Sequence, residues 1–161
     1  MSSIKKSPEY IWSLICDNQL EEAYKSLTGM QDGSVWIQNA MAVCQMRMGK
    51  PEKACALLID LVYQKNSVVL RADATDATKL NLATAMLMTG NIEGALGVFN
   101  CVKHETPMKK NVEYAIQVWK TKQSLFSRIG MLFGMYPSTK VELDFPPGQI
   151  EVNLQNKLFT H

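Results

Sequence analysis

A short segment occurs twice in this chain, 41 residues apart, and it constrains the fold more than any other feature. Residues 48–54 read MGKPEKA and residues 89–95 read TGNIEGA. Each copy follows an apolar stretch with helical spacing and precedes another. A Gly that ends one helix, a short polar turn and a buried Ala in the next helix indicate a helix–turn–helix hairpin. Repetition of this hairpin predicts a stacked helical array, whose usual work is to hold another macromolecule.

Capping residues and apolar spacing extend the helical pattern over most of the chain. The expected helices run from Ser7-Pro8 to Asp17, from about Gln19 to near Gly29, from Ser34 to Gly49, from Pro51 through Val62, from Asp73 or Asp76 to Gly90, through a partner helix that stops before Pro107, and from near Lys110 to about Met135. Two places stay open. Residues 66–76 either extend a helix or form a loop, and a break near 122–124 is an alternative to one long final helix.

The last part of the chain changes its period. Residues 140–145 alternate apolar and charged side chains, the turn-forming residues 146–149 follow, and 150–154 alternate again. Two period-2 runs around a Pro/Gly turn predict a β-hairpin. An isolated hairpin is marginal in water, so its apolar face should dock on the last helices. The alternative is an extended tail without strand pairing.

Specific positions within the hairpins carry a family resemblance. The best set is Leu82-Ala83, Gly90, Ala95, Phe99 and Pro107. The next is Met41-Ala42, Gly49, Ala54 and Leu58, with Asn66 where a Pro would close the unit. A weaker copy has Tyr10, Ala23 and Leu27, with Ile11 at the small position and Asn18 at the turn. Asn adopts the left-handed conformation of a helix end more readily than other non-Gly residues.

These sets resemble the tetratricopeptide repeat over roughly residues 7–107. Their alanines are spaced 31 and 41 residues apart, where the family has a regular 34. The resemblance implies an all-α, right-handed superhelical array of about three hairpins, followed by a long C-terminal capping helix and a short β-hairpin or extended tail. We expect one repeat domain over 1–136 and a packed hairpin or tail over 137–161.

Composition excludes several other classes of protein. Of the 161 residues, 47% are hydrophobic and 20% charged, which is ordinary for a soluble globular chain. The net charge of +2 provides no basic field for nucleic acid or anionic lipid, and no apolar run reaches the length of a bilayer span. We read no signal peptide. The four cysteines form no C-x-x-C pair, so reduced thiols and a cytoplasmic location are expected.

Motifs for catalysis are lacking in the sequence. The two histidines, His104 and His161, share no short metal-ligand spacing with a cysteine, and neither a phosphate-binding Gly loop nor a nucleophile elbow occurs. We therefore expect no enzyme, no cofactor and no metal. The basic cluster between Lys103 and Arg128 is interpreted as a solvated helix face.

By the resemblance, the first helix of each pair lines a concave groove that binds a partner. The candidate partner-binding residues are Trp36, Asn39, Val43, Arg47, Leu80, Thr84 and Met88. An aromatic anchor with flexible thioethers suits an adaptable apolar recess. Asn39 and Asn81 fall near positions at which some members grip a chaperone's C-terminal carboxylate, but the basic residues of that clamp are missing.

We therefore expect a non-catalytic protein-interaction module or adaptor that binds a peptide or helix in its groove. One alternative is a chaperone-like holder of a secreted or assembly partner. Another is a homo-oligomer that pairs through the face of Phe126 to Tyr136 or through the alternating tail. An RNA binder is less favoured, because the units are irregular and the net charge is small. No nucleic acid and no membrane insertion are expected. A tail seated in the chain's own groove would occlude it.

Overall fold

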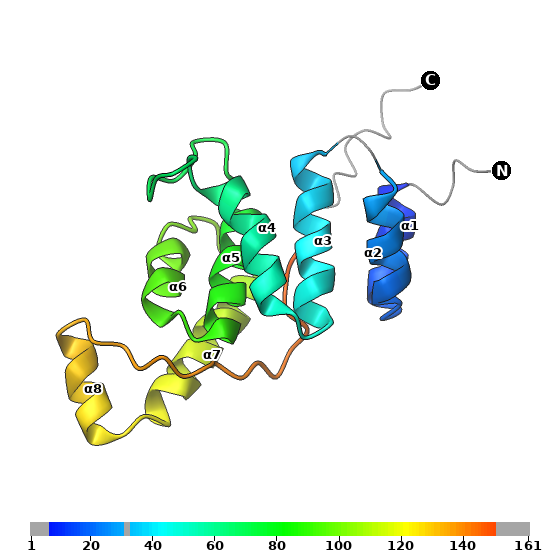
Figure 1. Cartoon of the computed structure of the whole chain (residues 1–161). Helices are drawn as coiled ribbons and strands as arrows, with labels where there is room; N and C mark the ends of the chain where they lie inside the picture. Colours follow the sequence, from blue (N-terminus) through cyan, green and yellow to red (C-terminus); the bar gives the residue numbers. More distant parts are fainter. Residues whose placement is uncertain (1–6, 31–32, 151–161) are drawn as a thin grey trace.

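The structure is a computed structural model, and it describes residues 7–30 and 33–150. Figure 1 shows an all-helical chain, and no strand occurs in these residues. The eight described helices are α1 (Pro8–Cys16), α2 (Leu20–Thr28), α3 (Val35–Arg47), α4 (Pro51–Val62), α5 (Asp76–Thr89), α6 (Ile92–Phe99), α7 (Pro107–Thr121) and α8 (Leu125–Leu132).

Helices α1 to α6 pack in chain order. Each contacts the next one along the chain, and α3 also contacts α5. The alanines at the repeated position, Ala23, Ala54 and Ala95, are each fully buried in the second helix of a pair. A small side chain at this position lets the two helices approach closely. The all-helical fold and the three predicted hairpins are therefore present.

The three hairpin turns share one geometry. Asn18, Gly49 and Gly90 have φ values of 58°, 72° and 87°, so each chain reversal uses a left-handed residue. The amide after each of them donates to a carbonyl five residues back, as Gln19 does to Leu14 (2.8 Å), Lys50 to Gln45 (2.9 Å) and Asn91 to Met86 (2.9 Å). This is the Schellman pattern of a helix end. The prediction that Asn18 replaces Gly at the first turn is confirmed.

Two segments left open by the sequence are resolved. Residues 63–75 form a loop rather than a helix extension, and Tyr63 and Leu70 form an isolated antiparallel bridge within it. The N-cap of α5 is Thr75, whose hydroxyl accepts a hydrogen bond from the amide of Thr78 at 3.2 Å. The prediction that Asp73 or Asp76 caps this helix was therefore wrong. The observed cap lies one residue before Asp76.

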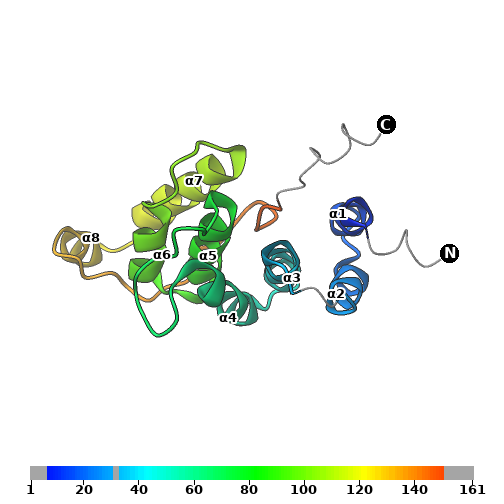
Figure 2. The same ribbon diagram turned by 90° about the horizontal axis from the view of Figure 1, so that it is seen from above.

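The structure has two helices where one long capping helix was expected. α7 begins at Pro107, earlier than predicted, and ends at Thr121. α8 begins at Leu125 after the N-cap Ser124, whose hydroxyl accepts from the amide of Ser127 at 3.2 Å. A Ser that satisfies the free amides of a new helix favours a break over continuation. α8 lies at the edge of the molecule (Figures 1 and 2).

Residues 137–150, here called the strap, return from α8 across the first helices of the pairs (Figures 1 and 2). The strap contains no helix and no strand, and it bends at Asp144 and Phe145, so residues 140–145, the first arm of the predicted hairpin, form no paired strand. The second arm lies outside the described residues except for Ile150. Val141 and Ile150 are buried in the same core as the helices.

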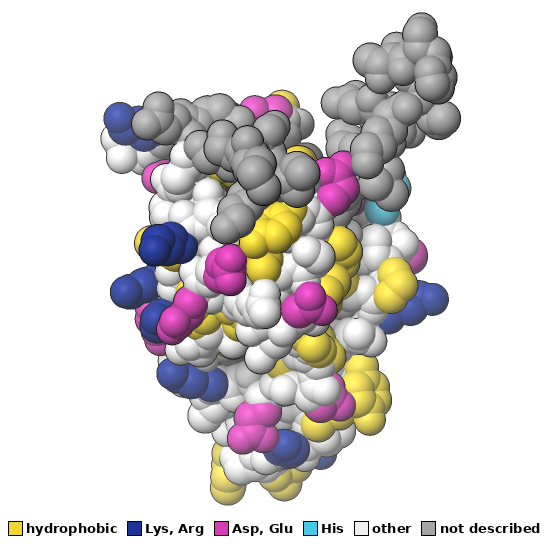
Figure 3. Space-filling model, turned by 90° about the vertical axis from the view of Figure 1, so that its right-hand side faces the viewer, with side chains coloured by type: hydrophobic (Ala, Val, Ile, Leu, Met, Phe, Trp, Pro, Cys, Tyr) yellow, Lys and Arg dark blue, Asp and Glu magenta, His cyan; other side chains and the backbone are white. Residues whose placement is uncertain are grey.

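One hydrophobic core runs through the helical pairs, and α3 and α5 are its most buried helices. α3 and α5 have little amphipathic character, because each carries buried residues on most of its sides. From the α1–α2 end, charges of both signs are scattered among small apolar patches (Figure 3). Among the described residues, no helix has the length and apolarity to cross a bilayer.

Candidate functional site: the inner face and the strap

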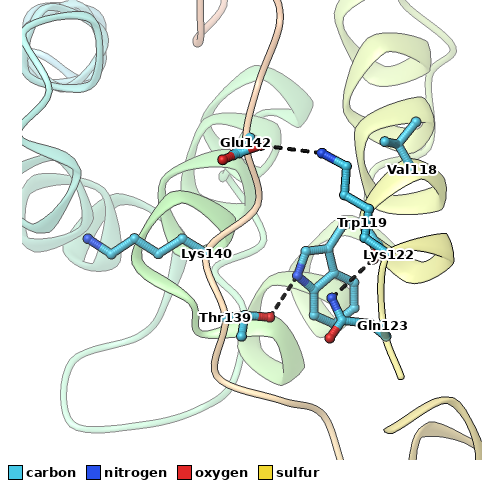
Figure 4. Close-up of a pocket in the computed structure, with 7 residues that line it drawn as sticks. All are labelled: Val118, Trp119, Lys122, Gln123, Thr139, Lys140 and Glu142. Atoms are coloured by element: carbon cyan, nitrogen blue, oxygen red, sulfur yellow. Dashed lines mark hydrogen bonds and ion pairs between the residues drawn. The ribbon is translucent and has the colours of Figure 1, made fainter. Parts of the chain in front are cut away.

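The site is the contact between the strap and the inner face, which we define as the side of α3, α5 and α7 that the strap covers. At its first end the strap crosses α7 (Figure 4). The indole Nε1 of Trp119 donates to the Thr139 hydroxyl at 2.9 Å, and Trp119 is itself buried. Lys122 and Glu142 form an exposed ion pair at 3.3 Å, which solvent screening makes weak.

The strap next passes the end of α5. The amide of Val141 donates to the carbonyl of Leu87 at 3.0 Å, which lies in the last turn of α5 and also accepts from the Gly90 amide at 3.2 Å. Gly90 permits this close approach, because a Cβ atom there would lie 2.8 Å from the carbonyl oxygen of Ser138. The glycine of the repeated segment therefore serves both the turn and the strap.

Farther along, two buried asparagines hold the main chain of Gln149. The Asn81 amide nitrogen donates to the Gln149 carbonyl and its oxygen accepts from the Gln149 N–H, both at 2.7 Å. Asn39 donates to the same carbonyl at 3.2 Å and accepts from Asn81 at 2.9 Å. Asn81 is fully buried, so its hydrogen-bonding groups are satisfied by this arrangement rather than by water.

Arg47, at the end of α3, adds main-chain contacts on either side. Its guanidinium donates to the carbonyls of Pro147 at 3.0 Å, Gly148 at 3.3 Å and Ile15 at 3.4 Å. It thereby joins the last turn of α1 to the strap. Burial lowers the pKa of this guanidinium, which is nevertheless cationic at neutral pH. Among the described residues, no carboxylate pairs with it.

Gly148 lies directly on the inner face. A Cβ there would be 2.8 Å from Cγ2 of Val43 and 2.9 Å from Cε of Met46, both buried. The φ of Gly148 is also positive, at 90°. Both the space and the backbone conformation therefore select glycine at this position.

The predicted partner-binding residues divide into three groups. Asn39, Val43 and Arg47 touch the strap, as described above. Leu80 and Thr84 are buried in α5, where the Thr84 hydroxyl donates to the Leu80 carbonyl at 2.7 Å. Trp36 and Met88 are half-buried against the core. The Trp36 Nε1 is buried without an acceptor among the described residues.

Sequence reasoning left Asn81 out of the predicted set, although it makes the shortest contacts to the strap. A signal was present. Asn is a poor residue for a helix interior, and Asn81 lies between the apolar Leu80 and Leu82 in α5. A polar side chain in such a setting requires a hydrogen-bonding partner.

Two open recesses of about 310 and 320 Å³ lie where the strap crosses α7. The first is lined by Trp119, Lys122, Gln123, Thr139 and neighbouring residues (Figure 4). Elsewhere, burial raises the pKa of the Cys44 thiol to about 11, which keeps it protonated and unreactive. The described residues contain no group of three His, Cys, Asp or Glu side chains arranged for a metal ion.

Comparisons with protein-family models, with curated proteins and with solved structures gave no match.

Proposed function

We propose that this protein is a non-catalytic interaction module built from tetratricopeptide-like hairpins in a superhelical array, and that its inner face binds an extended peptide. The strap is the intramolecular occupant of this peptide site. The observation that carries the proposal is the pairing of Asn81 with both main-chain groups of Gln149. Recognition through the main chain is independent of side chains, so the same contacts would hold a peptide from a partner.

The strap sets rules for such a peptide. The strap uses only main-chain atoms of residues 147–149 in its hydrogen bonds with Asn39, Arg47 and Asn81. Gly148 is the position at which side-chain size matters, because Val43 and Met46 leave no room for a Cβ. The expected ligand is thus an extended segment with glycine one residue before the amide that Asn81 holds.

Arg47 offers a means by which a partner can compete with the strap. Its present acceptors are three neutral carbonyls, so its half-buried charge has no opposite charge among the described residues. A charge-assisted hydrogen bond is roughly twice as strong as a neutral one. A ligand that placed a carboxylate at Arg47 would gain an interaction that the strap lacks.

The proposal is tested with a fluorescent peptide of residues 140–150 added to the full-length chain. We expect the wild-type protein to bind it weakly, because the tethered strap has an effective concentration on the order of millimolar. Gly148→Ala should weaken the strap and improve peptide binding at least about tenfold, since a left-handed alanine costs roughly 1–2 kcal/mol before the clash with Val43 is added. Fluorescence anisotropy measures both affinities.

Gly97→Ala is the matched control, because a Cβ at Gly97 meets nothing within 4 Å. A second peptide carrying the Gly148→Ala change should bind neither protein. Circular dichroism verifies that each variant keeps its helices. Equal peptide affinity of wild type and Gly148→Ala, with both proteins folded, would contradict the proposal and make the strap a permanent part of the fold.

A further inference from the structure

α8 presents its apolar side to the solvent. Successive residues of a helix are turned by about 100°, which places five side chains on one continuous arc of about 120°. These are Leu125, Phe126, Ile129, Leu132 and the adjoining Phe133. Phe126 is 86% exposed and Leu132 83% exposed, and no residue of α8 is buried. The inward side carries Ser127 and Met131, of which Met131 packs against the core.

Basic side chains are concentrated in the part of the chain that contains this arc. Between Pro107 and Leu132 the chain has five basic residues and one acid, so this part has a net charge of +4 and the remainder of the chain −2. The small total charge of +2 therefore conceals an uneven distribution. Among the described residues, Lys110, Lys120 and Arg128 have no ion-pair partner.

Two of these cations share a recess with the apolar arc. An open recess of about 330 Å³ is lined by Gln117, Lys120, Thr121, Arg128, Met131, Leu132 and Tyr136. Gln117 and Thr121 lie on the stripe of α7 that also carries Lys110 and the exposed Tyr114. Cations, an aromatic hydroxyl and an apolar helix thus lie on one side of the molecule.

We propose that α8 and this recess bind the surface of an anionic lipid bilayer. The apolar arc would lie in the interface, parallel to the membrane, while Lys120 and Arg128 contact lipid phosphates and Tyr136 lies at headgroup depth. α8 has eight residues and is about 12 Å long, which suits shallow burial and is far too short to span a membrane.

Charge and area both favour lipid over a second copy of the chain. Pairing two copies through α8 would bring Arg128 and its neighbouring lysines close to their equivalents, which repel. A stable protein interface also uses about 20–30 residues from each partner, and this arc supplies five side chains. An anionic bilayer has the opposite charge and can cover the arc completely.

The test is flotation of the full-length protein with phosphatidylcholine vesicles, with or without about 30% phosphatidylserine. We expect the protein to float with the anionic vesicles and to dissociate at high salt. The double variant Phe126→Ser/Phe133→Ser should bind at least about tenfold more weakly, because each buried aromatic ring contributes strongly to partitioning. Lys120→Glu/Arg128→Glu should abolish the preference for anionic lipid.

Matched controls are available elsewhere in the chain. Val68→Ser removes a side chain that is 89% exposed but lies in the loop after α4, and Lys53→Glu reverses an exposed charge on α4. Both should bind vesicles as the wild type does. Failure of the wild type to bind anionic vesicles would overturn the proposal. Equal binding by all variants would also overturn it. A third contradicting result would be a protein that does not bind vesicles but forms a dimer in sedimentation velocity, if the Phe126→Ser/Phe133→Ser change dissociates that dimer.

Discussion

Asp76 connects the first turn of α5 to the loop that follows α6. Its carboxylate accepts hydrogen bonds from the amides of Lys103 at 2.9 Å and His104 at 2.8 Å, and from the His104 ring at 2.6 Å. Burial alone would raise the pKa of this carboxyl, but the hydrogen bonds and the charge of Lys79 lower it to about 2. A carboxylate at a helix N-terminus is also favoured by the helix dipole.

This lowered pKa makes stability depend on acidity. The carboxylate stabilises the fold above its ordinary pKa of 3.8, and that contribution is lost as the pH falls from about 4 toward 2. We expect Asp76→Asn to be about 2 kcal/mol less stable near neutral pH, and this deficit to shrink by nearly half at pH 3. Urea unfolding at several pH values measures it. Asp60→Asn, an exposed acid on α4, is the control, and a deficit that stays constant with pH would contradict the assignment.

At the scale of elements, the turns and the strap depend on each other. Gly49 and Gly90 occupy the same place in two hairpins and have similar φ values of 72° and 87°. A Cβ at Gly49 would meet nothing within 4 Å, whereas one at Gly90 would meet the Ser138 carbonyl at 2.8 Å. Substitutions at the two positions therefore distinguish the strain of a left-handed residue from the displacement of the strap.

Gly49→Ala should destabilise the protein by about 1–2 kcal/mol, from backbone strain alone. Gly90→Ala should cost at least about 1 kcal/mol more, because the strap must also lose hydrogen bonds such as that from Val141 to Leu87. Chemical denaturation of the two variants gives the comparison. Equal losses would show that the strap does not rest on this turn.

Elements that depend on local chemistry could be predicted from the sequence. Ser7, Ser34 and Pro51 mark helix starts because their effect is confined to one turn, and Asn18 supplies the left-handed residue at a break. The path of the strap could not be predicted. Asn81 and Gln149 are 68 residues apart, and their pairing depends on how the helices stack. The alternation in residues 140–145 suggested a paired strand, but these residues form no strand and bend at Asp144 and Phe145.

The candidate site was predicted in part for the same reason. The family resemblance selected Asn39, Val43 and Arg47 as groove residues, and all three contact the strap from α3. The same resemblance selected Leu80 and Thr84, which are both buried in α5. Their orientation depends on the packing of α4 and α6 around α5, which a single sequence does not specify.

At the scale of the whole molecule, the strap connects parts of the chain that are distant in sequence. It contacts α7 through Trp119, α5 through Asn81 and Leu87, and α3 through Arg47, which also reaches α1. Within the positively charged α7–α8 region, Lys122 pairs with Glu142 of the strap, whereas Lys120 and Arg128 line a separate recess beside α8. The molecule thus has an inner face covered by its own chain and an apolar helix, α8, exposed at one end (Figure 2).

The central claim is that the strap occupies a peptide site and leaves it without unfolding of the helices. Amide hydrogen exchange of the full-length protein measures this directly. The Gln149 amide, bound to Asn81, should be protected, with an opening free energy clearly lower than that of amides inside α5. Asn81→Ala should remove the protection while α5 keeps its own. Exchange of Gln149 at the rate of an unstructured peptide, or only together with global unfolding, would contradict the claim.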